Sequence, residues 1–211
     1  MPWPMVHFAI ASEIVPHPSP TLLLGSLAPD SIHVRTNVRS EKAKTHLMAT
    51  EHQFAADTDL QQVMASEMNV LRMRRDPQFL HYLCGYIAHI YTDREWTFQI
   101  YPPYEADPNG REIYTHDVKK LEFRIRREYA GASEWLDQLR IAKGYEFGGL
   151  KAQEVCAYRE EKFDFFAYSE NEPDGDLKIL TMETVTEFIH KTASDLKTRF
   201  KEWQIYEQLQ S

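Results

Sequence analysis

Hydrophobic positions recur at helical spacing along most of the chain, and the sustained polar–apolar alternation that indicates strands occurs nowhere. The pattern predicts about seven or eight helices. The expected helical segments are residues 5–14, 19–28, 58–73, 77–101, 113–131, 133–139, 151–168 and 177–209. Residues 31–50 are polar and partly basic, and we expect them to form a loop with short turns. The sequence therefore predicts an all-α fold, a multi-helix bundle in a single domain spanning residues 1–211.

Local signals set the expected ends of several of these helices. The pair Ser19-Pro20 is typical of a helix start, with serine as the capping residue and proline in the first turn. Asp76-Pro77 predicts the start of the most apolar helix, which we expect to end at Pro102-Pro103. The segments 107–110 and 172–175 combine Asp, Asn, Pro and Gly and predict turns.

Composition narrows the classes of function. The chain has 43% hydrophobic and 27% charged residues, which excludes a largely disordered protein. Acidic residues outnumber basic ones 32 to 24, and this net charge of −8 argues against broad nucleic-acid binding. No run is apolar and long enough for a membrane span, and no basic region precedes the first apolar stretch. Two cysteines provide no disulfide framework, so we expect a cytoplasmic protein.

The helix expected over residues 77–101 carries a polar stripe. His81, Gly85, His89 and Asp93 are spaced four apart and therefore share one face of a helix that is otherwise Leu, Tyr and Ile. A divalent metal would satisfy the imidazole of His89 and the carboxylate of Asp93 together, and a structural His–carboxylate pair is the alternative. Gly85 leaves room for another ligand-bearing helix or for substrate.

Three residues outside this helix are further candidates for the same polar site. His7 lies in the apolar run 5–11, where a histidine needs a partner. Asp30 follows the helix end marked by Pro29, and His46 lies in the polar stretch 44–47. These side chains could meet His89 and Asp93 in space.

Four segments occur in a characteristic order: His7-x-x-x-Ala11, Gly25-Ser-Leu-Ala-Pro-Asp30, Lys44-Thr-His46 and Gly85-Tyr-Ile-Ala-His89-x-x-x-Asp93. In this order and spacing they resemble the zinc-dependent phospholipase C family, which is all-α and distantly related to the S1/P1 nucleases. The resemblance covers about residues 3–100. It implies a metal-dependent hydrolase in which metal-activated water attacks the phosphorus of a phosphoester, with a small molecule or a lipid head group as substrate.

The resemblance also implies the metal ligands. His7 and Asp93 would hold one zinc ion, and Asp30, His46 and His89 would hold a second, with Asp93 bridging the two. Asp30 would also be catalytic, because its carboxylate could orient or deprotonate the water. The mixed His and Asp ligands would also admit manganese, iron or nickel.

The chain departs from that family in two places. Trp3 is only four residues before His7 and follows Met1-Pro2, so the N-terminal tryptophan ligand of the secreted phospholipases is not reproduced. Their His-x-x-x-Glu pair is also absent, since His116 is followed by Lys120. We therefore expect two metal ions rather than three.

Basic side chains near these segments are candidates for holding phosphate oxygens. They are Arg94, Arg35 and Lys44. Solvated surface charge is the alternative for each of them.

Two alternative functions remain open. The doublet His116-Asp117 is typical of HD-domain phosphohydrolases, which are also all-α and ligate metal with an upstream His and a distant Asp. The partners would be His81 or His89, and Asp164 or Asp176. The second alternative is a non-catalytic helical binding domain stabilised by metal, which would have no open coordination position. The sequence does not determine the oligomeric state.

Overall fold

The computed structural model describes residues 2–74 and 76–210, and for residues 70–74 it describes the backbone only. Within these residues the chain is helical, and β-structure is limited to two isolated bridges, which confirms the all-α prediction. The α-helices are α1 (Pro4–Ile14), α2 (Pro20–Leu27), α3 (Arg39–Thr45), α4 (Asp57–Arg74), α5 (Pro77–Gln99), α6 (Pro102–Glu105), α7 (Gly110–Glu128), α8 (Ala132–Arg140), α9 (Ala152–Ala167) and α10 (Met182–Glu202). Short 3₁₀ helices are η1 (Ala28–Val34), η2 (Ser169–Asn171) and η3 (Tyr206–Leu209).

Each of the eight predicted helical segments contains an α-helix, and two further short α-helices were not predicted. The expected loop over residues 31–50 was wrong, because it contains the end of η1 and all of α3. Helix α3 has seven residues, of which only Ala43 and Thr45 are buried, so it lacks the apolar periodicity that marks longer helices. Helix α6 begins at Pro102, since proline in the first turn both ends α5 and starts a new helix.

The C-terminal helix is shorter than predicted. The backbone N–H groups of residues 178–180 donate hydrogen bonds to the carboxylate of Asp117, which holds this segment outside the helix. Helix α10 begins after Thr181, whose hydroxyl accepts a hydrogen bond from the N–H of Thr184 at 3.1 Å. It ends before Gln204, which has a left-handed φ of 60°.

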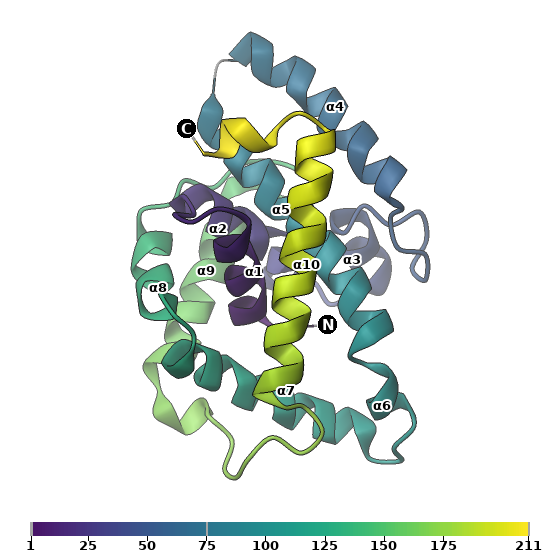
Figure 1. The fold of residues 1–211 in the computed structure, drawn as a ribbon, viewed down its shortest axis with the longest axis vertical. Coiled ribbons are helices and arrows are strands. Elements are labelled where there is room, and N and C mark those ends of the chain that lie inside the picture. Colours follow the sequence, from purple (N-terminus) through teal and green to yellow (C-terminus); the bar gives the residue numbers. More distant parts are fainter. Residues whose placement is uncertain (1, 75, 211) are drawn as a thin grey trace.

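Helix α5 runs through the middle of the molecule and is buried along most of its length (Figure 1). It packs closely against α2 and also contacts α1, α4 and α10. Helix α10 crosses the front of the view, α8 and α9 lie on one side, and α3 and α6 lie on the other. Helix α9 packs on η1. The buried apolar side chains form one contiguous cluster around these helices.

Two glycines allow α2 and α5 to cross with their backbones in contact. A Cβ atom on Gly25 would lie 2.0 Å from the carbonyl oxygen of Tyr82, and one on Gly85 would lie 2.1 Å from that of Leu22. The space that Gly85 leaves in the polar stripe is therefore filled by the backbone of α2. This helix leads directly into η1 and Asp30, so the crossing fixes one wall of the candidate site.

A buried carboxylate holds the start of α1. Glu122 of α7 is 1% exposed, and the backbone N–H of Met5 donates to its two oxygens at 3.0 and 3.2 Å. Burial raises the pKa of Glu122 from 4.5 to about 8, and the bond from Met5 only partly opposes this shift. Glu122 therefore anchors the helix that carries His7.

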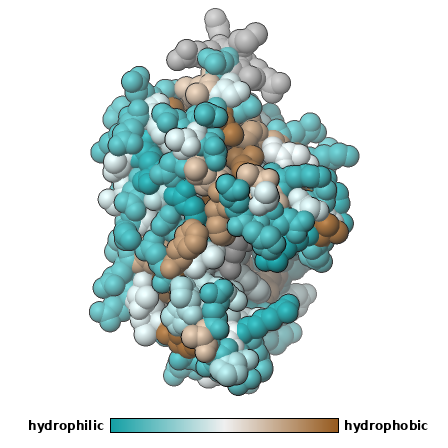
Figure 2. All heavy atoms as spheres, turned by 90° about the vertical axis from the view of Figure 1, so that its right-hand side faces the viewer, coloured by the Kyte–Doolittle hydropathy of each residue, from teal (hydrophilic) through white to brown (hydrophobic). Residues whose placement is uncertain are grey.

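The face that carries α3 and α6 is mostly hydrophilic, with a narrow strip of apolar side chains along its middle (Figure 2). Phe98 of α5 is 64% exposed and lies edge-on to Phe54, with ring centroids 5.8 Å apart. Among the described helices, none combines the length and apolar character needed to cross a membrane.

The helix crossing leads to a stability prediction. We expect Gly85→Ala to lower the free energy of unfolding by about 3 kcal/mol or more, because the new methyl group meets backbone atoms that cannot move aside. Denaturant unfolding measures the change. Gly175→Ala is the control, since Gly175 has φ 79° but open space, and it should cost only about 1 kcal/mol. Equal stability of Gly85→Ala and the wild type would contradict the close crossing.

The buried carboxyl of Glu122 leads to a pH prediction. Its pKa of about 8 in the folded protein lies above the ordinary 4.5, so its contribution to stability is complete below pH 4.5 and is lost as the pH rises through about 8. We expect the stability of the wild type relative to Glu122→Gln to fall over this range by roughly 1.4 kcal/mol per unit of pKa difference.

The measurement is urea unfolding of both proteins across this pH range, in the presence of a chelator so that metal binding does not contribute. A stability difference between the two proteins that does not change with pH would show that Glu122 is ionised when buried.

Candidate metal centre

The five residues proposed as metal ligands converge at the centre of the molecule. His7 lies on α1, Asp30 on η1, His46 directly after α3, and His89 and Asp93 one turn apart on α5. His46 is held there from two sides. The hydroxyl of Thr45 donates to the Pro29 carbonyl at 3.0 Å, and the Tyr86 hydroxyl donates to the Thr45 carbonyl.

The facing atoms lie at similar distances from one another. Nε2 of His46 is 3.4 Å from Oδ1 of Asp30 and 3.3 Å from Oδ2 of Asp93. Nε2 of His89 is 3.4 Å from Oδ2 of Asp93, and Nε2 of His7 is 3.6 Å from Oδ1 of Asp93. Two atoms bound at about 2.1 Å to one tetrahedral zinc ion would be about 3.4 Å apart. The spacing within the cluster therefore fits atoms that share a cation.

Backbone carbonyls set the orientation of two imidazoles. Nδ1 of His89 donates to the Ser26 carbonyl at 2.8 Å, and Nδ1 of His46 donates to the Lys42 carbonyl at 2.9 Å. In the neutral rings both Nε2 atoms therefore carry lone pairs, and these two atoms face each other at 3.3 Å. The two Nε2 lone pairs are both hydrogen-bond acceptors, and no donor lies between them. Their close approach is favourable only when a cation or a proton lies between the two nitrogens. Carbonyls that fix the tautomer in this way are typical of metal-binding histidines.

His7 and Asp93 have buried polar atoms without hydrogen bonds. Both ring nitrogens of His7 and both carboxylate oxygens of Asp93 are buried and have no hydrogen-bond partner among the described residues. The His7 ring stacks on His89 with centroids 4.0 Å apart. Burial, followed by the neighbouring His89, lowers the pKa of His7 to about 3, so this ring is neutral and can bind a metal.

The remaining titration shifts indicate that the cluster attracts positive charge. Burial opposes ionisation of Asp93, but the histidines around it hold the pKa of this carboxyl well below its usual range. Burial also disfavours a charged His46, whereas the nearby carboxylates of Asp30 and Asp93 raise its pKa. The negative charge of these carboxylates thus favours a proton on His46 when no cation is bound. Metal binding must displace it, so metal affinity should fall with falling pH.

The cluster divides into two overlapping sets of ligand atoms. His7, His89 and Asp93 form one set and Asp30, His46 and His89 form the other, each with one atom per residue within 4.8 Å of the others. The two oxygens of Asp93 face different sets, since Oδ1 faces His7 and Oδ2 faces His46 and His89. His89 belongs to both sets, but its Nε2 can bind only one ion because its Nδ1 is bonded to the Ser26 carbonyl. The residues present could thus hold two neighbouring ions, with His89 serving one of them and Asp93 facing both.

Asp30 differs from the other four residues in its surroundings. Its side chain is 15% exposed, whereas each of the others is 3% exposed or less. Lys42 donates to Oδ1 of Asp30 at 2.7 Å, and Nε2 of His33 lies 3.8 Å from the same oxygen. Burial opposes ionisation of Asp30, but Lys42 and the histidines lower the pKa of this carboxyl well below 3.8. Asp30 is therefore an ionised ligand at the open side of the cluster.

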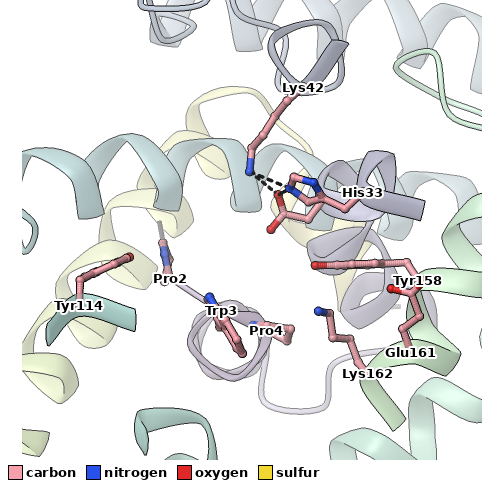
Figure 3. A pocket seen from close by; sticks show the side chains of 10 residues that line it. Pro2, Trp3, Pro4, His33, Lys42, Tyr114, Tyr158, Glu161 and Lys162 are labelled. Atoms are coloured by element: carbon pink, nitrogen blue, oxygen red, sulfur yellow. Dashed lines mark hydrogen bonds and ion pairs between the residues drawn. The ribbon is translucent and has the colours of Figure 1, made fainter. Parts of the chain in front are cut away.

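Two cavities reach the cluster from outside. The larger, about 420 Å³, is lined by Asp30, His33 and Lys42, by Tyr114, by residues 2–4, and by Tyr158, Glu161 and Lys162 of α9 (Figure 3). A second cavity of about 280 Å³ is lined by Lys42, His46 and neighbouring residues between Arg39 and Phe54. Lys42 lines both cavities, so its ammonium group lies between them.

The three basic residues expected to hold phosphate are paired elsewhere. Arg94 donates to the carboxylate of Asp57 at 2.7 Å. Arg35 pairs with Glu154 at 2.9 Å, and Lys44 pairs with Glu41 at 2.6 Å. None of the three lines the larger cavity, so the cations available to a ligand there are different ones.

The doublet of the HD-domain alternative serves a structural purpose in this fold. Asp117 accepts hydrogen bonds from the Tyr104 hydroxyl at 2.7 Å and from the backbone of residues 178–180. His116 contacts Asp117 through Nδ1 and the Asp174 carbonyl through Nε2. His81, the other histidine considered, bonds to Ser19 at the start of α2. Among the described residues, the candidate ligand groups contain none of these three.

Sequence reasoning missed three residues that line the larger cavity: Lys42, Tyr158 and Lys162. Lys42 precedes His46 by four positions, but this spacing is meaningful only on a helix, and the segment was expected to be a loop. Tyr158 and Lys162 are also four apart on a predicted helix. The sequence therefore predicted that Tyr158 and Lys162 share one face of a helix, but nothing in it placed that helix beside η1.

Comparisons of the chain with protein-family models, with curated proteins and with solved structures found no match. The interpretation of the site therefore depends on its own geometry.

The shared carboxylate leads to a metal-binding prediction. We expect wild-type protein to bind about two zinc ions and Asp93→Asn to bind less than one, because the amide loses the charge and one acceptor. Without metal, Asp93→Asn should be as stable as the wild type to within about 1 kcal/mol, since its amide can donate to an imidazole Nε2.

Elemental analysis and thermal unfolding with and without a chelator measure these changes. His116→Ala is the control and should keep the full metal content, whereas an HD-type site would lose it. Full zinc content in Asp93→Asn would rule out the bridging role.

Proposed function

We propose that this protein is a metal-dependent hydrolase of phosphoesters that uses two divalent ions, with zinc as the expected metal. The observation that carries the proposal is the open side of the ligand cluster. Four of the candidate ligands are 3% exposed or less, while Asp30 is 15% exposed and lines a cavity of about 420 Å³. A structural zinc site is enclosed by its ligands, whereas a catalytic site keeps a position open for water and substrate.

The ligand chemistry supports a pair of hard or borderline divalent ions. Imidazole and carboxylate ligands suit zinc and also admit manganese, iron or nickel. His7 and Asp93 would hold one ion and Asp30, His46 and His89 the other, with one oxygen of Asp93 facing each ion. Such a pair supplies an activated water and offsets the charge on phosphoryl oxygens.

The chain's own residues would orient the reaction. Lys42 binds Oδ1 of Asp30, and Asp30 lines the cavity, where its carboxylate can orient the attacking water or accept its proton. Lys42 holds Asp30 in place through a bond of 2.7 Å. The carbonyls of Ser26 and Lys42 keep the ring nitrogens of His89 and His46 directed at the metal positions.

The open carboxylate leads to a prediction of activity. We expect the zinc-loaded wild type to hydrolyse a chromogenic phosphoester and Asp30→Asn to lower kcat at least about 100-fold, because the amide cannot accept the proton of water. Turnover measured with and without a chelator tests this expectation. Asp137→Asn, an exposed carboxylate on α8 that is 84% exposed, is the control and should retain full activity.

Two results would overturn the proposal. One is wild-type protein that binds zinc and gains stability from it but turns over no phosphoester, which would favour the metal-stabilised binding domain. The other is Asp30→Asn with undiminished kcat.

A further inference from the structure

Two side chains of α9 reach into the larger cavity from the wall opposite Lys42. Tyr158 and Lys162 are one helical turn apart, and their hydroxyl and ammonium groups point into the cavity that Asp30 also lines (Figure 3). The packing of α9 on η1 brings this face of the helix to the metal cluster.

Neither polar group is committed to another part of the protein. Within the described chain, the ammonium of Lys162 forms no hydrogen bond or ion pair and lies over the rings of Tyr158 at 4.3 Å and Trp3 at 5.6 Å. The Tyr158 hydroxyl likewise forms no hydrogen bond with a described residue. Both groups face the cavity and are therefore available to bind an acceptor on a ligand.

Both groups are donors, so the ligand they suit is rich in anionic oxygens. Burial raises the pKa of Tyr158 well above 10, which keeps the phenol protonated. Burial also lowers the pKa of Lys162, and a bound anion would offset that effect. The charge of Lys42 is already neutralised by Asp30, and Glu161 is exposed at the rim of the cavity. Lys162 is therefore the unpaired positive charge inside this cavity.

We propose that Lys162 and Tyr158 bind a phosphoryl oxygen of the substrate and thereby make the enzyme selective for phosphomonoesters over phosphodiesters. This inference rests on the proposed two-metal function. A diester has two non-bridging oxygens, and a pair of metal ions can bind both. A monoester has a third anionic oxygen, which needs donors of its own, and it carries one more negative charge.

The dimensions of the cavity are consistent with a compact substrate. A volume of about 420 Å³ lies in the lower part of the range typical of small-molecule sites. Trp3 and Tyr114 contribute aromatic surface to its walls, which can pack against the group that the phosphate esterifies.

The binding test uses inorganic phosphate and isothermal titration calorimetry with metal-free and zinc-loaded protein. We expect Lys162→Met to weaken phosphate binding about tenfold or more and Tyr158→Phe to weaken it about threefold, whereas Lys162→Arg should stay close to the wild type. Lys143→Met is the control, because Lys143 also lies over a tyrosine ring, at 5.0 Å, but does not line this cavity. Unchanged phosphate binding by Lys162→Met would overturn the proposal.

The selectivity test compares p-nitrophenyl phosphate with bis(p-nitrophenyl) phosphate. We expect a higher kcat/KM for the monoester, and Lys162→Met should reduce this preference by about tenfold with little effect on the diester. A wild-type preference for the diester, or equal losses for both substrates, would contradict the inference. The two proposals fail separately: phosphate binding by metal-free protein that depends on Lys162 would support the anion site even if zinc-dependent turnover were absent.

Discussion

The backbone contact between α2 and α5 is the constraint on which the rest of the site depends. Gly25 and Gly85 remove the side chains that would hold these helices apart, so carbonyl oxygens of each helix lie where Cβ atoms would be. The Ser26 carbonyl consequently comes within 2.8 Å of the His89 ring. Because α2 continues directly into η1, the same crossing also places Asp30 opposite the ligands of α5.

Near this helix crossing, hydrogen-bond acceptors lie close together without matching donors. The lone pairs of His46 and His89 face each other, and Asp93 adds oxygens that nothing in the described chain satisfies. Such a cluster is unfavourable in a buried environment without a cation. Its cost is tolerated because the large apolar core around α5 stabilises the fold independently of the site. Proteins commonly combine a stabilising core with a locally unfavourable functional site in this way.

Much of this arrangement was predictable from sequence, and the rest was not, for physical reasons. Long helices such as α5 and α10 bury apolar side chains over many turns, so their hydrophobic pattern predicts them. Helix α3 buries too little to leave such a pattern, and its existence depends on tertiary contacts of Thr45. The five candidate ligand residues were proposed from their order in the chain and a family resemblance, and the structure brings them together. The cavity wall formed by Tyr158 and Lys162 required the packing of α9 on η1, which no local pattern encodes.

Lys42 links two of the ligands through different parts of one residue. Its carbonyl orients the His46 ring, while its ammonium holds Asp30. Both contacts belong to a helix of seven residues with few buried side chains, and such elements open more readily than a protein's core. Fraying of α3 would therefore withdraw one imidazole and release one carboxylate in a single event. If a metal ion binds Asp30 and His46, its occupancy and the order of this short helix would be thermodynamically coupled.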